Sequence, residues 1–223
     1  MNVPKPLLSS MLLVVSCAIF ASAQQPVNSE PPSGVSKKAN ARPAEAVVTK
    51  PDPFDGAPVE KMALQCVTLE TEAGAIEIEM LADAAPENAR SFLNLAATGA
   101  LDTTTFSRIV KDFVIQGGNL STGEKWGVEL SKRMSRKLPD EPGLIKHERG
   151  IVSMARPDEA NSATTSFFIL ISAGQHLDGK FSAFGRVTKG IEVADNINHA
   201  DTDGEKPNKP VRITRAVVAP CKR

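Results

Sequence analysis

The sequence has few aromatic residues and no excess of either charge. Its 223 residues include nine Phe, one Trp and no Tyr, and Lys plus Arg balance Asp plus Glu at 26 each. A chain without net charge has no overall field that would attract nucleic acid or an acidic surface. The length suits one good-sized domain with appendages, but not two. We therefore expect an ordinary soluble globular domain that does not bind nucleic acid.

The familiar motifs of cofactor-dependent and nucleophilic enzymes are absent as well. The chain contains no G-x-G-x-x-G, no phosphate-binding loop, no H-E-x-x-H, no G-x-S-x-G and no C-x-x-C. Its three histidines, His147, His176 and His199, are too scattered to suggest a metal site. The sequence thus predicts neither a cofactor nor a metal ion. The remaining options are binding and noncovalent catalysis.

Residues 1–23 have the pattern of a secretory signal peptide. Lys5 precedes an apolar run over 7–20, and Ala21-Ser22-Ala23 has small residues at the first and third places of a cleavage site. A competing interpretation takes Val-Val-Ser-Cys, ending at Cys17, as a lipoprotein processing site, which would give membrane attachment through a lipid. We favour ordinary cleavage, because the residues after Cys17 stay largely apolar. Both interpretations predict export, to the periplasm or to a lipid-anchored position in the envelope.

A disordered linker is predicted over residues 24–62, which are rich in Pro, Ser, Ala, Asn and Lys and offer no apolar face. The folded domain is expected over 63–223, beginning near Leu64. If the signal is removed, two cysteines remain, Cys66 and Cys221, at the two ends of this domain. On the oxidising side of a membrane they would form a disulfide joining the first strand to the last. Two unpaired thiols are the alternative.

Short apolar runs bounded by turn residues dominate the domain. Residues 67–70 and 76–80 alternate apolar and polar around Glu72-Ala73-Gly74, which predicts a hairpin with one buried face. Further strands are expected from the runs 106–110, 113–115, 151–154, 167–171, 183–187 and 211–218. About eight strands, with a first strand that bonds to the last, predict a mainly β fold: a closed eight-stranded antiparallel barrel.

Two α-helices are expected to cap this barrel. One opens at Pro86, a favoured first helical residue, and stops at Gly99. The other fits 191–198, which has apolar residues roughly on one side. The basic run over 132–137 is interpreted as a solvated loop, within a stretch whose pattern favours no regular element.

Four blocks of the sequence resemble the cyclophilin family, in the family's order. Residues 106–118, FSRIVKDFVIQGG, resemble its signature F-x-R-[IV]-[IV] leading to F-x-x-Q-G-G. Residues 149–156, RGIVSMAR, are similar to its R-G-x-[IVL]-[SA]-M-A segment. Residues 161–169, NSATTSFFI, resemble its N-S-A-T-S-Q-F-F-I run, and 177–187 resemble L-D-G-K-x-x-x-F-G-x-V. The resemblance covers roughly 64–221 and implies a peptidyl-prolyl cis-trans isomerase.

The physical chemistry of that reaction can be stated independently. A peptide bond before proline rotates slowly, because breaking its conjugation costs about 18–20 kcal/mol. In the twisted amide the proline nitrogen regains a lone pair, so a fixed cationic donor beside it stabilises that state more than either planar one. Arginine suits this task, since it stays charged and offers several donors in a rigid plane. An apolar pocket must grip the proline ring while the preceding segment turns.

The resemblance assigns roles to individual residues. Arg108 is the expected catalytic cation, Gln116 holds it and contacts substrate backbone, and Phe113 lines the proline pocket. The other substrate-binding positions implied are Phe168, Leu177, Val114, Met154, Ala155, Arg156, Ser166, His176 and Phe181. The expected partners are proline-containing unfolded or folding polypeptides, and the protein is expected to be a monomer.

Three of these positions depart from the family pattern. Ser166 stands where a glutamine usually contacts the substrate, His176 where animal-type members have tryptophan, and Phe181 where a rim histidine is frequent. A second hypothesis is therefore a catalytically weak or inactive module that binds proline peptides or acts as a chaperone. A third is a structural envelope protein held by a lipid on Cys17, the one case in which a membrane is a partner.

Overall fold

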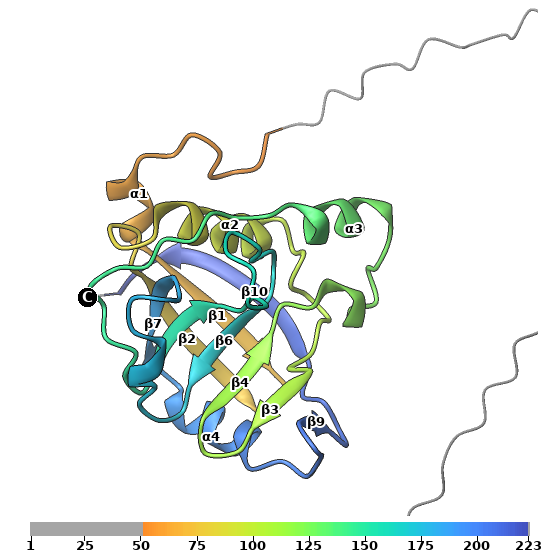
Figure 1. Ribbon diagram of the computed structural model, residues 1–223. Helices are drawn as coiled ribbons and strands as arrows, with labels where there is room; N and C mark the ends of the chain where they lie inside the picture. Colours follow the sequence, from red (N-terminus) through yellow and green to blue (C-terminus); the bar gives the residue numbers. More distant parts are fainter. Residues whose placement is uncertain (1–50, 223) are drawn as a thin grey trace, which may run out of the picture. The chain divides into compact units, whose positions relative to one another are not determined.

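The computed structural model describes residues 51–222 (Figure 1). Its main element is a curled sheet of eight antiparallel strands in the order β10-β1-β2-β7-β5-β6-β4-β3. These strands are β1 (Gln65–Thr71), β2 (Gly74–Met80), β3 (Arg108–Val110), β4 (Val114–Gly117), β5 (Ile151–Met154), β6 (Phe167–Leu170), β7 (Ala183–Lys189) and β10 (Ile213–Pro220). A separate ladder joins β8 (Thr202–Asp203) to β9 (Lys206–Pro207). The predicted mainly β fold is confirmed.

The helices are fewer than the strands. They are α1 (Val59–Ala63), α2 (Pro86–Ala97), α3 (Val128–Ser135) and α4 (Ile191–Asn198), with 3-10 turns η1 (Leu120–Thr122) and η2 (Gln175–Leu177). Figure 1 shows α2 and α4 at opposite ends of the curled sheet. The two predicted helices are α2 and α4, and α1 and α3 were not predicted.

β1 and β2 form the hairpin that their alternating pattern predicts. Val67 and Leu69 on β1 and Ile78 on β2 are fully buried. The alternate residues Thr68 and Glu77 are only partly buried, and Glu70 is exposed. Across the ladder, buried apolar residues lie opposite each other, with Val67 opposite Ile78 and Leu69 opposite Ile76. A slip of one residue would turn every one of these apolar side chains to solvent, so the pattern fixes the register.

The main core lies inside the curl of the sheet, beneath α2. The ring of Phe92 on α2 packs against Phe167 of β6 at 5.1 Å and against Phe184 of β7 at 4.9 Å between ring centroids. All three rings are fully buried. The helix therefore holds β6 and β7 together by edge and tilted aromatic contacts, which add to the gain from burying the rings.

The sheet curls without closing into a barrel. Its two edge strands, β10 and β3, are not joined by a ladder, and Thr105 and Arg212 form only an isolated bridge between the segments that precede them. Backbone bonds from Phe106 to Val211 and from Ile213 to Thr104 support that bridge. The predicted closed barrel is therefore not confirmed. The chain forms a half-barrel with a loosely bridged seam.

The ordered domain begins earlier than the predicted boundary at residue 63. Phe54 and Met62 are buried in the main core. The backbone N–H of Phe54 donates to Asn94 Oδ1 at 2.8 Å, and Arg90 Nη1 donates to the carbonyls of Phe54 and Ala57 at 2.7 and 2.8 Å. The prediction of a disordered linker is thus wrong for residues 51–62. The predicted signal peptide, the rest of the linker and Cys17 lie outside the described residues.

The basic run predicted as a solvated loop is partly helical. α3 includes Lys132 and Arg133, and Arg133 makes a bidentate ion pair with Asp52, with N–O distances of 2.6 and 2.7 Å. α3 buries no residue completely, and its Leu130 and Met134 pack against the main core as partly buried side chains. Within residues 51–222, no helix has both the length and the apolar character needed to cross a bilayer.

Cys66 and Cys221 form the predicted disulfide, with their Cα atoms 4.9 Å apart. It lies at the end of the β1–β10 ladder, in which Cys66 pairs with Ala219. The backbone N–H of Cys221 also donates to the carbonyl of Leu64 at 3.0 Å. The bond therefore ties the first strand of the chain, β1, to the last, β10, which lies beside it in the sheet.

Candidate active site

Arg108 and Gln116 face each other across the β3–β4 hairpin. They are register partners in that ladder, so their side chains lie on the same face of the sheet. Arg108 Nη1 donates a hydrogen bond to Gln116 Oε1 at 3.1 Å. The spacing of eight residues in the sequence thus becomes a direct contact, because the hairpin folds the chain back on itself.

The turn of this hairpin is fixed from behind by Asn198, the last residue of α4. Asn198 is fully buried, and its Nδ2 donates to the carbonyls of Val110 and Val114 at 2.8 and 3.1 Å. Its Oδ1 accepts from the backbone N–H of Asp112 at 2.8 Å. Asp112 has φ +56°, a left-handed conformation that asparagine and aspartate tolerate better than most residues. This anchoring holds Phe113, the next residue, at the edge of the site.

The glycine after β4 is required by close packing. Gly118 has φ +82°, and a Cβ there would lie 2.3 Å from the carbonyl oxygen of Thr165. The hydroxyl of Thr165 donates to the carbonyl of Gly118 at 2.8 Å. Larger residues are therefore excluded from this position, and the strand leaves the site along one path.

An apolar pocket of about 140 Å³ opens beside the guanidinium. It is lined by nine residues, all of them predicted at the site: Arg108, Phe113, Val114, Gln116, Ala155, Arg156, Phe168, Leu177 and Phe181. They come from the β3–β4 hairpin, the segment after β5, β6, and η2 with the segment after it. Pockets for drug-sized ligands measure about 300–1,000 Å³, so this one suits a single ring or side chain.

The floor of the pocket is a small apolar cluster separate from the main core. It includes Val114, Phe168 and Leu177, each less than a tenth exposed. Phe168 meets Phe181 edge to face, with 5.9 Å between ring centroids. These contacts fix the pocket walls before any ligand enters, which lowers the entropic cost of binding.

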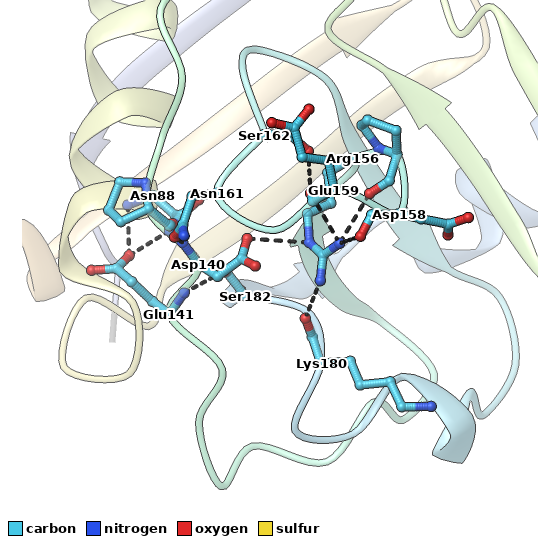
Figure 2. Close-up of polar contacts among 12 residues, drawn as sticks. Asn88, Asp140, Glu141, Arg156, Asp158, Glu159, Asn161, Ser162, Lys180 and Ser182 are labelled. Atoms are coloured by element: carbon cyan, nitrogen blue, oxygen red, sulfur yellow. Dashed lines mark hydrogen bonds and ion pairs between the residues drawn. The ribbon is translucent and has the colours of Figure 1, made fainter.

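Arg156 closes one rim of the pocket, with its guanidinium surrounded by oxygen atoms (Figure 2). Its Nη1 donates to the carbonyls of Pro157 and Asp158 at 2.9 and 3.2 Å, and its Nη2 donates to the carbonyl of Lys180 at 3.1 Å. Nε lies 3.1 Å from Asp140 Oδ1, and the Arg156 side chain is only 13% exposed. The guanidinium also lies 5.0 Å from the centre of the Phe181 ring. Arg156 thus joins three loops and supports Phe181.

Three predicted site residues do not line the pocket. Met154 is buried in the main core. His176 is exposed, and its ring lies 5.4 Å from that of Phe113, tilted by 30°. Ser166 lies beside the pocket, where its carbonyl accepts from the backbone N–H of Ala155 at 2.9 Å.

A buried histidine supports the wall behind Leu177. His147 Nδ1 lies 3.1 Å from Asp178 Oδ1, and Nε2 lies 3.0 Å from Ser153 Oγ. Burial lowers the pKa of His147, and the hydrogen bond to the Asp178 carboxylate opposes that shift only in part. The backbone N–H of His147 in turn lowers the pKa of Asp178. Ser153 is fully buried, so this Ser-His-Asp arrangement has no access to a substrate and acts as a structural tie.

One charged partner of Arg108 has no counterpart among the residues predicted from the sequence. Glu205 lies in the turn between β8 and β9, and its Oε2 is 2.7 Å from Arg108 Nε. Arg108 lowers the pKa of Glu205 by donating this hydrogen bond. The two residues are 97 positions apart, and no local pattern signals the contact.

The fold and the pocket together define a class of protein. A preformed apolar pocket for one ring lies beside an arginine whose donors are oriented by neighbouring oxygens, and the described residues contain no cluster of three or more potential metal-binding side chains. Such a site has room for one apolar ring and places a cation next to it.

Comparison with known proteins gives the family. Residues 66–218 match the family described as cyclophilin type peptidyl-prolyl cis-trans isomerase/CLD. The chain is 37% identical over 157 residues to the peptidyl-prolyl cis-trans isomerase cypE of Dictyostelium discoideum, which covers 70% of this chain and 98% of that protein. It is 34% identical over 162 residues to peptidyl-prolyl cis-trans isomerase A of Dickeya dadantii, and the match covers 68% of this chain and 83% of that protein. The chain belongs to the cyclophilin family of peptidyl-prolyl cis-trans isomerases.

Solved structures agree with this assignment. A cyclophilin-type isomerase from Cryptosporidium parvum superposes with a TM-score of 0.63 at 28% identity, covering 71% of this chain and 99% of that one. The structure of the Cryptosporidium parvum isomerase determined in the presence of the dipeptide Ala-Pro gives a TM-score of 0.61 at 29% identity, covering 69% of this chain and 98% of that one.

Proposed function

We propose that this chain accelerates X-Pro rotation in exported proteins, by noncovalent stabilisation of the twisted amide with Arg108. The proline ring enters the pocket between Phe113, Phe168 and Leu177. The guanidinium then stabilises the twisted amide, in which the proline nitrogen carries a lone pair. No covalent step is needed, because the barrier lies only in the lost conjugation.

The observation that carries this proposal is the position of Arg108 relative to the pocket. The guanidinium lines the same pocket as the three apolar residues, and Gln116 Oε1 orients it at 3.1 Å. A surface arginine with only a structural role would not need an apolar pocket for a ring beside it. The pocket is also too small for a large ligand, as a proline site should be.

The test is a protease-coupled assay of cis-to-trans conversion in a short proline peptide, with the full chain and its Arg108→Ala variant. Loss of one oriented donor is expected to lower kcat/KM about 100- to 1,000-fold. Arg215→Ala is the matched control, because Arg215 is an exposed arginine on β10 and does not line the pocket. A folded wild-type chain that gives no acceleration would reject the enzyme mechanism proposed for it.

The second candidate function is a binding or chaperone module with weak catalysis. Ser166 favours it, because a serine is too short to supply the hydrogen bonds of a glutamine at that position. In this case the chain would bind proline peptides in a titration and yet leave their isomerisation rate nearly unchanged. Saturable binding with full acceleration would reject it.

The proposed location is outside the cytoplasm, in the periplasm, with a monomeric protein acting on proline-containing polypeptides. The disulfide between Cys66 and Cys221 supports this, because such bonds persist in oxidising compartments. Mass spectrometry of the mature protein, after expression of the full chain, tests how its N-terminus is processed. Cleavage after Ala23 supports an unanchored protein, whereas a lipid on Cys17 that disappears in Cys17→Ser supports the anchored alternative. Retention of an unprocessed chain in the cytoplasm would reject both.

A further inference from the structure

Arg108 is held by two oxygen atoms from different parts of the chain. Gln116 reaches Nη1 from the neighbouring strand, and Glu205 reaches Nε from the β8–β9 turn at 2.7 Å. Arginine carries five N–H donors in one plane. The two contacts occupy one donor on Nε and one on Nη1, and Nη2 donates to no residue in the described part of the chain. Three donors, five minus two, thus remain for a substrate.

The backbone determines the position of Glu205. Its carbonyl accepts a hydrogen bond from the N–H of Ile109 at 2.8 Å, so the turn is attached to β3 directly beside Arg108. β8 and β9 pair through Thr202 with Pro207 and Asp203 with Lys206, which leaves Gly204 and Glu205 as a two-residue turn. Gly204 has φ +58°, the sign that a type II′ turn requires at its first central residue.

The pair differs from an ordinary surface ion pair in what it orients. The side chains of Arg108 and Glu205 are 44% and 55% exposed, so the pair itself stabilises the fold little. A half-exposed arginine has many rotamers, however, and two acceptors on two edges of one planar group leave it few orientations. Because the acceptors come from separate backbone segments, the guanidinium plane is set by the fold.

We propose that Glu205 is a positioning residue for catalysis, which holds the Arg108 guanidinium so that its remaining donors face the X-Pro amide. This inference rests on the proposed role of Arg108. Glu205 does not line the pocket and is not expected to touch the proline ring. Its removal should therefore act on the catalytic step and leave substrate binding nearly unchanged.

The experiment compares full-length wild type with Glu205→Ala, Glu205→Gln and Arg108→Ala by kcat and KM for cis-to-trans conversion. For Glu205→Ala we expect kcat to fall about three- to tenfold, because solvent already weakens this half-exposed pair and Gln116 still holds the guanidinium. KM should change less than about twofold. Glu205→Gln keeps an acceptor on the same stem and is expected to recover part of the loss. The Nε–H resonance of Arg108, assigned with the Arg108→Ala variant, is expected to broaden or disappear in Glu205→Ala.

Asp203→Ala is the matched control, because Asp203 is an exposed residue in the same hairpin and its carboxylate has no hydrogen bond or ion pair with any residue of 51–222. It should leave kcat and the Arg108 resonance unchanged. If Glu205→Ala matches wild type while Arg108→Ala is inactive, this inference is wrong and the proposed function stands. Equal losses of activity in Glu205→Ala and Asp203→Ala would reject the inference in the same way. An inactive wild type would overturn both.

Discussion

The disulfide between Cys66 and Cys221 should supply a large share of the stability of this domain. The cysteines lie 155 positions apart. A bond across so long a loop removes much of the freedom of the unfolded chain, and the loop-entropy relation gives about 5 kcal/mol for this separation. Removing native disulfides commonly costs about 2–5 kcal/mol. We therefore expect Cys66→Ser/Cys221→Ser to lose about 3–5 kcal/mol of unfolding free energy.

The folded state should tolerate this change, because backbone pairing already holds both ends. The β1–β10 ladder runs from Gln65 with Pro220 to Thr71 with Ile213. Neither cysteine lines the pocket. The double variant should thus keep its kcat/KM at 25 °C while its melting temperature falls by roughly 6–20 °C.

The assay is urea unfolding followed by far-UV circular dichroism, for the oxidised chain and the double serine variant. The denaturant slope should rise in the variant, because its unfolded chain is less compact, so unfolding free energies must be compared in place of midpoints alone. Reduction of the wild type should reproduce the variant. If the oxidised and variant chains differ by less than about 1 kcal/mol, the loop-entropy reasoning fails for this protein.

Three further predictions concern residues around the site. Glu141 accepts the first two backbone N–H groups of α2 at 3.0 and 2.9 Å, so Glu141→Ala should cost about 1–2 kcal/mol in urea unfolding, as loss of a helix cap does; an unchanged midpoint would contradict this. The pKa of His147 lies below its ordinary value of 6.5 and that of Asp178 below 3.8, so in both cases the unfolded chain takes up protons first as the pH falls. Unfolding free energy should therefore decrease as the pH falls below about 6.5, and a flat profile between pH 7.5 and 5 would reject the role of His147. Ser166→Gln should raise kcat/KM about two- to tenfold through an added hydrogen bond to substrate backbone, and Ser166→Ala should have no effect. Equal rates in all three chains would show that Ser166 does not limit catalysis.

β1, β2 and two helices could be predicted because their burial is periodic, whereas β5 and β6 are buried at every residue and were predicted from continuous apolar runs. In β1 and β2 every second residue is apolar, and α2 and α4 each bury one side. α3 was missed because only Leu130 and Met134, four residues apart among charged neighbours, pack against the core, which is a short signal in the sequence. The segment before residue 63 has the composition of a linker, which explains the wrong boundary. Its two anchors, Phe54 and Met62, are isolated apolar residues with no period.

The contact between Arg108 and Gln116 is local in the sequence, whereas the pocket residues after β5, on β6 and around η2 were named only through the family resemblance. Arg108 and Gln116 lie in one hairpin, so a short motif contains both the cation and one of its acceptors. The openness of the barrel had no such signal, since it depends on how far β10 and β3 remain apart after the whole sheet has curled.

The contact between Arg108 and Glu205 belongs to this nonlocal part of the site. The motif around Arg108 specifies one acceptor eight residues away, and the fold supplies the other from a turn 97 residues away. Two proteins with the same motif can therefore differ in how firmly their arginine is held, according to the segment that comes after α4. If orientation of the guanidinium limits the rate, the length and sequence of the β8–β9 turn influence catalysis through Arg108, although this turn does not line the pocket.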